Sequence, residues 1–140
     1  MLSPRYRVNN HLTLIYTFDF THQENNTGNA DFDDPNTIFA QRNRSNYTNS
    51  LQCKYAINNK MTVNLSARHY WAQVNNQEYM TLQPNGSLSS NPSYHINKDQ
   101  NLNLWNADLS YSWWFAPGSQ LTLLYRNNAT NFNRLLENSF

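Results

Sequence analysis

The stretch Trp105–Phe115, WNADLSYSWWF, decides the fold class of this chain. Its odd-numbered positions carry apolar or aromatic residues, and its even-numbered positions carry small polar residues except for Trp114. Successive side chains of a β-strand point to opposite faces of a sheet. The alternation therefore predicts a strand with one apolar face and one polar face.

The same alternation recurs along the chain and predicts six strands. They are expected at about residues 5–8, 11–22, 37–57, 60–75, 100–115 and 120–129. Short connections alternate with long ones, which are expected at about 22–36 and 75–100. The short connections contain Asn residues or Pro117-Gly118. Asn tolerates positive φ and Pro-Gly favours a tight turn, so antiparallel hairpins are expected there.

The composition excludes several classes of protein. The 140 residues are 39 % hydrophobic, 14 % aromatic and 14 % charged, and 25 of them are Asn. Disordered chains are poor in aromatic residues, and a membrane helix needs an apolar run of about 18 residues that this chain lacks. A net charge of +1 gives no indication of a nucleic-acid partner. The single cysteine, Cys53, excludes an internal disulfide.

We expect an all-β fold, an antiparallel meander of about six long strands that forms part of a transmembrane up-and-down β-barrel. Long strands, strictly alternating loop lengths and aromatic residues near strand ends are typical of such barrels. A soluble carbohydrate-binding β-sandwich, which also alternates apolar and polar residues, is the alternative. The smallest barrels have eight strands, so the sequence is expected to be a fragment of a larger chain.

The phase of each strand sorts the candidate functional residues in a barrel. Residues on the polar phase face the lumen, and Arg68 and Asp108 are expected at similar height and to form a salt bridge there. Residues on the apolar phase near strand ends are expected at the lipid interface. The predicted lumenal charge network is Arg68, Asp108, Arg126, Lys54 and Asp19. The predicted lipid-interface aromatics are Trp71, which is placed toward the outer end of its strand, with Tyr111, Trp113 and Phe115.

The first long connection contains an acidic cluster of Asp31, Asp33 and Asp34. Oxygen ligands at this spacing can hold calcium, but the full calcium-loop pattern is absent, so a solvated acidic loop is the competing interpretation. Aromatic residues expected in the loops, Phe32, Tyr79 and Tyr94, could stack on sugar rings. His69 is expected to be an interfacial residue, with a metal ligand as the alternative.

Catalytic motifs are absent from the sequence. It has no Gly-x-Ser-x-Gly elbow, no His-Glu-x-x-His and no glycine-rich phosphate loop. We therefore expect no enzymatic activity, no cofactor and no other metal site. The remaining alternative is an enzyme whose chemistry lies in parts of the protein outside this sequence.

Three segments resemble a known family. They are RHYW at 68–71, NGSL at 85–88 and DLSYSWWFAPGSQLTLLYRN at 108–127. They resemble the C-terminal barrel region of a large uncharacterised outer-membrane family of Gram-negative bacteria, whose members usually carry a carbohydrate-binding family 9-like domain before the barrel. The resemblance implies a place in the bacterial outer membrane and an anchoring or solute-passage role. It implies the lipid bilayer and the barrel assembly machinery as partners, and carbohydrate through an upstream domain that this sequence lacks.

Overall fold

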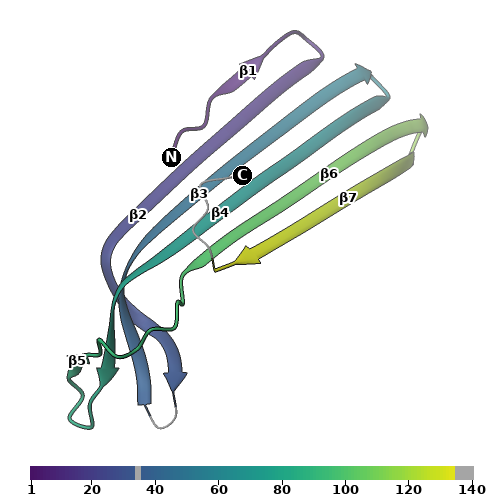
Figure 1. Cartoon of the computed structure of the whole chain (residues 1–140). Helices are drawn as coiled ribbons and strands as arrows, with labels where there is room; N and C mark the ends of the chain where they lie inside the picture. The colour runs from purple at the N-terminus through teal and green to yellow at the C-terminus, as the bar shows by residue number, and fades with distance from the viewer. Residues whose placement is uncertain (34–35, 135–140) are drawn as a thin grey trace. The chain divides into compact units, whose positions relative to one another are not determined.

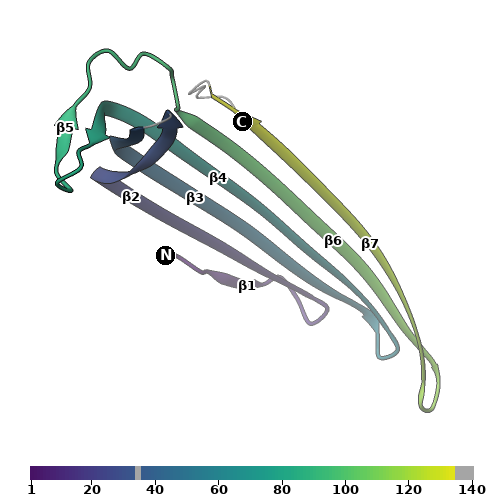
Figure 2. The same ribbon diagram turned by 90° about the horizontal axis from the view of Figure 1, so that it is seen from below.

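The computed structural model describes residues 1–33 and 36–134, which form one antiparallel β-sheet. Its long strands follow one another in the order of the sequence (Figures 1 and 2). The strands are β1 (Arg5–Arg7), β2 (Leu12–Asp33), β3 (Asn36–Asn58), β4 (Met61–Leu82), β5 (Leu88–Ser90), β6 (Gln100–Ala116) and β7 (Ser119–Asn133). The predicted all-β meander is confirmed. In the described residues β1 and β7 are the two edges of the sheet, and the short β5 pairs with β4.

The three short turns have the predicted chemistry. Between β1 and β2, the Asn9 side chain accepts hydrogen bonds from the backbone N–H groups of His11 and Leu12, each at 2.8 Å. Between β3 and β4, the Lys60 N–H donates to the Asn58 side chain at 2.8 Å. Between β6 and β7, Gly118 has φ +72°, a conformation that favours glycine. Because the meander is antiparallel, these three turns lie on the same side of the sheet, where β1, β3 and β6 end and β2, β4 and β7 begin.

The first predicted long loop is largely strand and the second is partly strand, which corrects the predicted boundaries. β2 continues to Asp33 instead of ending near residue 22, and β4 continues to Leu82 instead of ending near 75. These extensions carry polar residues on both faces, so they give no hydrophobic alternation. Polar side chains pair across them instead: His22 Nδ1 lies 2.8 Å from Ser45 Oγ, and the Asn25 N–H donates to Asn43 Oδ1 at 3.1 Å.

Contacts within the described chain group the residues into two compact units. Unit 1 comprises Met1–Phe20, Tyr47–Trp71 and Asn103–Asn131, and unit 2 comprises Thr21–Asn46, Ala72–Leu102 and Phe132–Phe140. The long strands contribute segments to both units.

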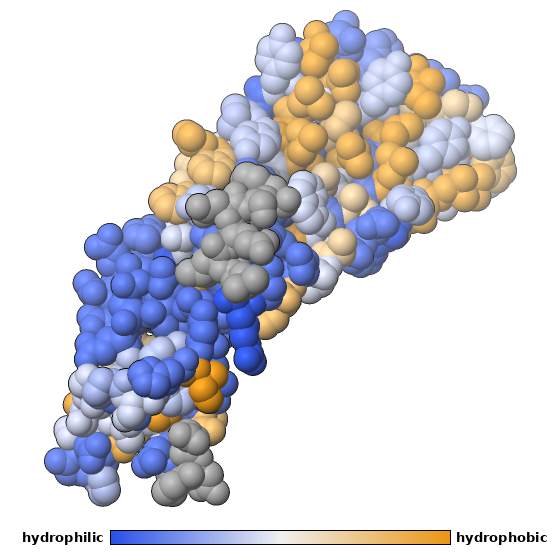
Figure 3. Space-filling model, viewed as in Figure 1, coloured by the Kyte–Doolittle hydropathy of each residue, from blue (hydrophilic) through white to orange (hydrophobic). Residues whose placement is uncertain are grey.

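Unit 1 is a sheet with one apolar and one polar face. The β1–β2 register places Tyr6 opposite Leu14 and Arg5 opposite Ile15, so each pair shares a face. Many large apolar side chains of this unit are exposed, including Leu109 at 43 % and Leu123 at 58 %. Figure 3 shows the resulting orange and white surface over unit 1. Trp71 is the one large apolar side chain of unit 1 that is buried among the described residues.

Unit 2 has a small core of its own. Ile38 and Ala40 from β3, Val74 from β4 and Tyr94 from the β5–β6 connection are at most 9 % exposed. The rest of its visible surface in Figure 3 is mostly hydrophilic. The described residues contain no helix that is long and apolar enough to cross a membrane.

Candidate functional site

An ion pair lies on the polar face of unit 1. Arg126 of β7 donates two hydrogen bonds to Asp108 of β6, from Nε at 2.8 Å and from Nη2 at 2.9 Å. The pair lines a shallow hollow of about 410 Å³ together with Ser66, Arg68, Asn106 and Asn128. The structure thus brings three members of the predicted charge network, Arg68, Asp108 and Arg126, to one polar surface.

The expected ion pair between Arg68 and Asp108 is replaced by the pair with Arg126. Asn64 of β4 donates to Ser110 of β6 at 3.5 Å, and this antiparallel register places Arg68 opposite Asn106. Arg126 lies directly opposite Asp108 across the β6–β7 hairpin. Among the described residues no ion pair joins Arg68 to Asp108. The phase of a strand predicts which face a residue lies on, but its cross-strand partner depends on the register of the two strands.

The other two members of the predicted network lie elsewhere in unit 1. Lys54 of β3 lines a second hollow of about 550 Å³, which Arg5 and Gln52 also line. Asp19 of β2 lies 3.6 Å from the amino group of Met1. In the described residues the five charges therefore form separate groups rather than one network.

Aromatic rings form rows across the strands where unit 1 ends. Phe20, Tyr47 and Trp71 stack with centroid distances of 4.8 and 5.0 Å, and they come from β2, β3 and β4. His69 stacks on Trp105 of β6 at 4.3 Å. The sequence predicted Trp71 near the end of its strand, but it lies in the middle of β4 because β4 is longer than predicted. Trp71 is 8 % exposed.

The remaining interface aromatics lie at the turn end of β6. Trp113 and Phe115 are 36 % and 51 % exposed, and their ring centroids are 5.5 Å apart. Tyr111 lies earlier on the same strand and is half-buried. The sequence reasoning missed Phe20 and Tyr47 as members of an aromatic row. Phe20 on β2 and Tyr47 on β3 both lie on the apolar phase of their strands, and this shared phase could have indicated the row.

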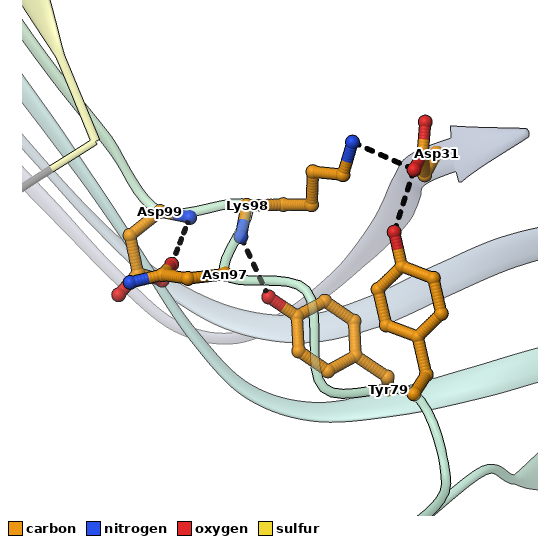
Figure 4. Close-up of polar contacts among 6 residues, drawn as sticks. Asp31, Tyr79, Asn97, Lys98 and Asp99 are labelled. Atoms are coloured by element: carbon orange, nitrogen blue, oxygen red, sulfur yellow. Dashed lines mark hydrogen bonds and ion pairs between the residues drawn. The ribbon is translucent and has the colours of Figure 1, made fainter.

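A second cluster of polar contacts lies in unit 2. Lys98 Nζ is 2.7 Å from Asp31 Oδ2, and the Tyr94 hydroxyl donates to the same oxygen at 2.6 Å. The Lys98 backbone N–H donates to the Tyr79 hydroxyl at 3.0 Å. Figure 4 shows Lys98 reaching from the β5–β6 connection to Asp31 on β2. These contacts tie that connection to β2, and they hold the pKa of Asp31 at about 2, mainly through the hydrogen bonds from Lys98 and Tyr94.

Two residues of the expected loop cation site, Asp31 and Asp33, lie on β2. Asp31 lies on β2 and is engaged by Lys98, so a cation would compete with that ammonium group. Asp33 is the last residue of β2, and Asp34 lies outside the described residues. Within residues 1–33 and 36–134, no group of three or more His, Cys, Asp or Glu side chains is arranged to hold a metal ion.

The expected sugar-stacking aromatics differ in exposure. The Tyr94 side chain is 8 % exposed, and its ring packs against Tyr79 at 4.9 Å, so this ring is not available for stacking. Phe32 is 77 % exposed. His69, expected at an interface, is 4 % exposed and lies 3.1 Å from Asn103 Oδ1 through Nε2.

Replacing Lys98 with Gln is expected to raise the pKa of Asp31 from about 2 toward its ordinary value, because the main interaction that favours the carboxylate is lost. A depressed pKa stabilises the fold above the unfolded pKa of about 3.9, and this contribution is lost as the pH falls through about 2. Carbon-13 NMR titration of the Asp31 carboxyl group measures its pKa in the unmodified protein and in K98Q. An unchanged midpoint in K98Q contradicts the assigned contact.

The chain was compared with known proteins. A family profile described as "Domain of unknown function (DUF5916)" matches residues 1–140. No curated protein and no solved structure matches the chain. Since the profile covers all the strands and turns described above, the chain belongs to the DUF5916 family.

Proposed function

We propose that unit 1 is a membrane-embedded segment of an outer-membrane β-barrel. Its apolar face contacts lipid and its polar face borders an aqueous lumen. In this proposal the chain acts architecturally, by anchoring the protein or bordering a path for solutes, and performs no chemistry itself. The observation that carries the proposal is that the charged side chains of the unit 1 strands lie on one face, whereas most of the exposed large apolar side chains lie on the other; Trp114 and Leu124 are the exposed exceptions on β6 and β7.

The charged side chains of the unit 1 strands lie on the polar phase. Arg5 and Arg7 share a face with Ile15 and Thr13, and Asp108 pairs with Arg126. Lys54 and Arg68 have the same phase as Gln52 and Ser66 on their strands. The remaining charges are Asp19, on the phase of Thr13 in β2, and Lys60, in a turn. The opposite face carries exposed Leu, Tyr, Trp and Phe. Water solvates such a face poorly, whereas lipid covers it at no cost.

The length of the apolar face fits a bilayer. Trp105 and Phe115 bound this face on β6 and are ten residues apart. At about 3.3 Å per residue the segment spans about 33 Å. A strand tilted by about 40° then crosses about 25 Å, the height of the apolar band of outer-membrane barrels. The rings of Phe20, Tyr47 and Trp71 end the same face on neighbouring strands, as aromatic girdles do.

Unit 2 has the character of a segment outside the bilayer. Its strands pair through Asn, Gln, His and Ser side chains, for example Gln41 to Asn25 at 3.1 Å. Few of its large apolar side chains are exposed; those named among the described residues are Phe32, Leu82, Leu88, Ile96 and Phe132. Polar strands that extend beyond the apolar band and end in long connections are typical of the extracellular side of such barrels.

Fractionation of the full-length protein tests this proposal. We expect the protein to stay with outer membranes through washes with carbonate and urea. We also expect it to migrate faster on a denaturing gel before heating than after, because a closed barrel resists the detergent until it is heated. Release into aqueous buffer together with heat-independent migration would support the soluble β-sandwich instead.

A further inference from the structure

Two arginines on β3 in unit 2 lie close together without an acidic partner among the described residues. Arg42 and Arg44 are separated by one residue, so both side chains lie on the same face, about 6.6 Å apart along the strand. Arg42 donates only to neutral oxygens, to Asn26 Oδ1 at 3.4 Å and to the Asn29 carbonyl at 3.2 Å. The Nε of Arg44 is buried and lacks a hydrogen-bond partner.

The acidic groups of unit 2 with described contacts are directed to other partners. Glu24 lies 3.4 Å from His22, and Asp31 pairs with Lys98. Asp99 accepts hydrogen bonds from the backbone and side chain of Asn76, at 2.8 and 3.1 Å. Burial, followed by the charge of Arg44, lowers the pKa of the Arg42 guanidinium. The dominant charge near Arg42 is therefore another cation.

The backbone leaves room for this arrangement at Gly28 of β2. A Cβ atom there would meet the Arg42 guanidinium, with its Nη2 atom nearest. Gly28 thus permits Arg42 to lie flat across β2. The two guanidinium groups repel each other, and the Arg44 Nε–H lacks an acceptor.

We propose that the Arg42–Arg44 pair is a binding site for a phosphate-type oxyanion. Guanidinium groups bind phosphate through paired, charge-assisted hydrogen bonds, and one tetrahedral anion can accept from two such groups. The anion offsets the repulsion between the two arginines. Free phosphate and the phosphodiester of a lipid headgroup share this chemistry.

Calorimetric titration of the purified full-length protein with inorganic phosphate tests the site. We expect Arg44→Gln to weaken phosphate binding at least about tenfold, because charge-assisted hydrogen bonds are lost. The matched control is Arg7→Gln, which removes an exposed guanidinium whose described contacts are the Asn9 carbonyl and Asn10. The control is expected to bind phosphate as the unmodified protein does. Equal affinity of R44Q and R7Q overturns the proposal.

Thermal unfolding separates an anion site from a purely structural role. Without phosphate, R44Q is expected to unfold at the same temperature as the unmodified protein or higher, because repulsion is relieved. Added phosphate is expected to raise the midpoint of the unmodified protein but not that of R44Q. A lower midpoint of R44Q with no phosphate effect on either protein contradicts the site.

A second anion identifies the source of the phosphate group. Binding of both inorganic phosphate and dimethyl phosphate supports a site that accepts lipid headgroups. Binding of inorganic phosphate alone supports a site for free phosphate. Binding of neither overturns the proposal.

Discussion

Leu109→Arg is expected to destabilise the protein in a bilayer by about 2–4 kcal/mol. Leu109 lies on the apolar face of β6, between Trp105 and Phe115, and is 43 % exposed. If that face contacts lipid, a guanidinium near the middle of the band must leave water. If the face contacts water, replacing an exposed leucine changes stability by only about 0.5 kcal/mol. The two readings therefore predict different free energies for one substitution.

The neighbouring residue provides the matched control. Ser110 lies on the polar face, two residues from Asp108, so the arginine of Ser110→Arg would have water and a carboxylate within reach. We expect S110R to change stability by less than about 1 kcal/mol. Urea unfolding in phospholipid vesicles measures both variants. Equal stability of L109R and S110R would contradict lipid contact at this face.

Alternation predicted the sheet well wherever one face of a strand is apolar. Trp105–Phe115 lies within β6, and the three short turns are where Asn and Pro-Gly placed them. Alternation failed in the second halves of β2 and β4, because Asn, Gln and Thr on both faces leave no hydrophobic period. Backbone pairing and hydrogen bonds between side-chain amides, such as the one from Gln41 to Asn25, hold those segments as strands.

In the candidate sites, the sequence predicted the face of each charged residue but not its ion-pair partner. The phase of each strand placed Arg68, Asp108 and Arg126 on one polar surface. It could not choose between Arg68 and Arg126 as the partner of Asp108, because a shift of two residues in register leaves every face unchanged. The contact of Asp31 with Lys98 was also beyond prediction, since 67 residues separate the two and no periodicity links them.

Cys53 provides a probe of the apolar face that needs no added label site. It is the single cysteine of the chain, is free, and lies on the apolar phase of β3 between Leu51 and Tyr55. Gln52 is its neighbour on the polar phase and is exposed. The matched variant is Gln52→Cys combined with Cys53→Ser. Any further cysteine in the full-length protein is replaced in both forms.

Labelling of these two thiols in intact outer membranes tests lipid contact most directly. The reagent is a charged maleimide that dissolves in water but not in lipid, and denatured samples show the full labelling capacity of each thiol. We expect the thiol at position 52 to react at least about tenfold faster than Cys53, because the thiolate that reacts cannot form in hydrocarbon. Equal, rapid labelling at both positions would contradict a lipid-facing apolar surface.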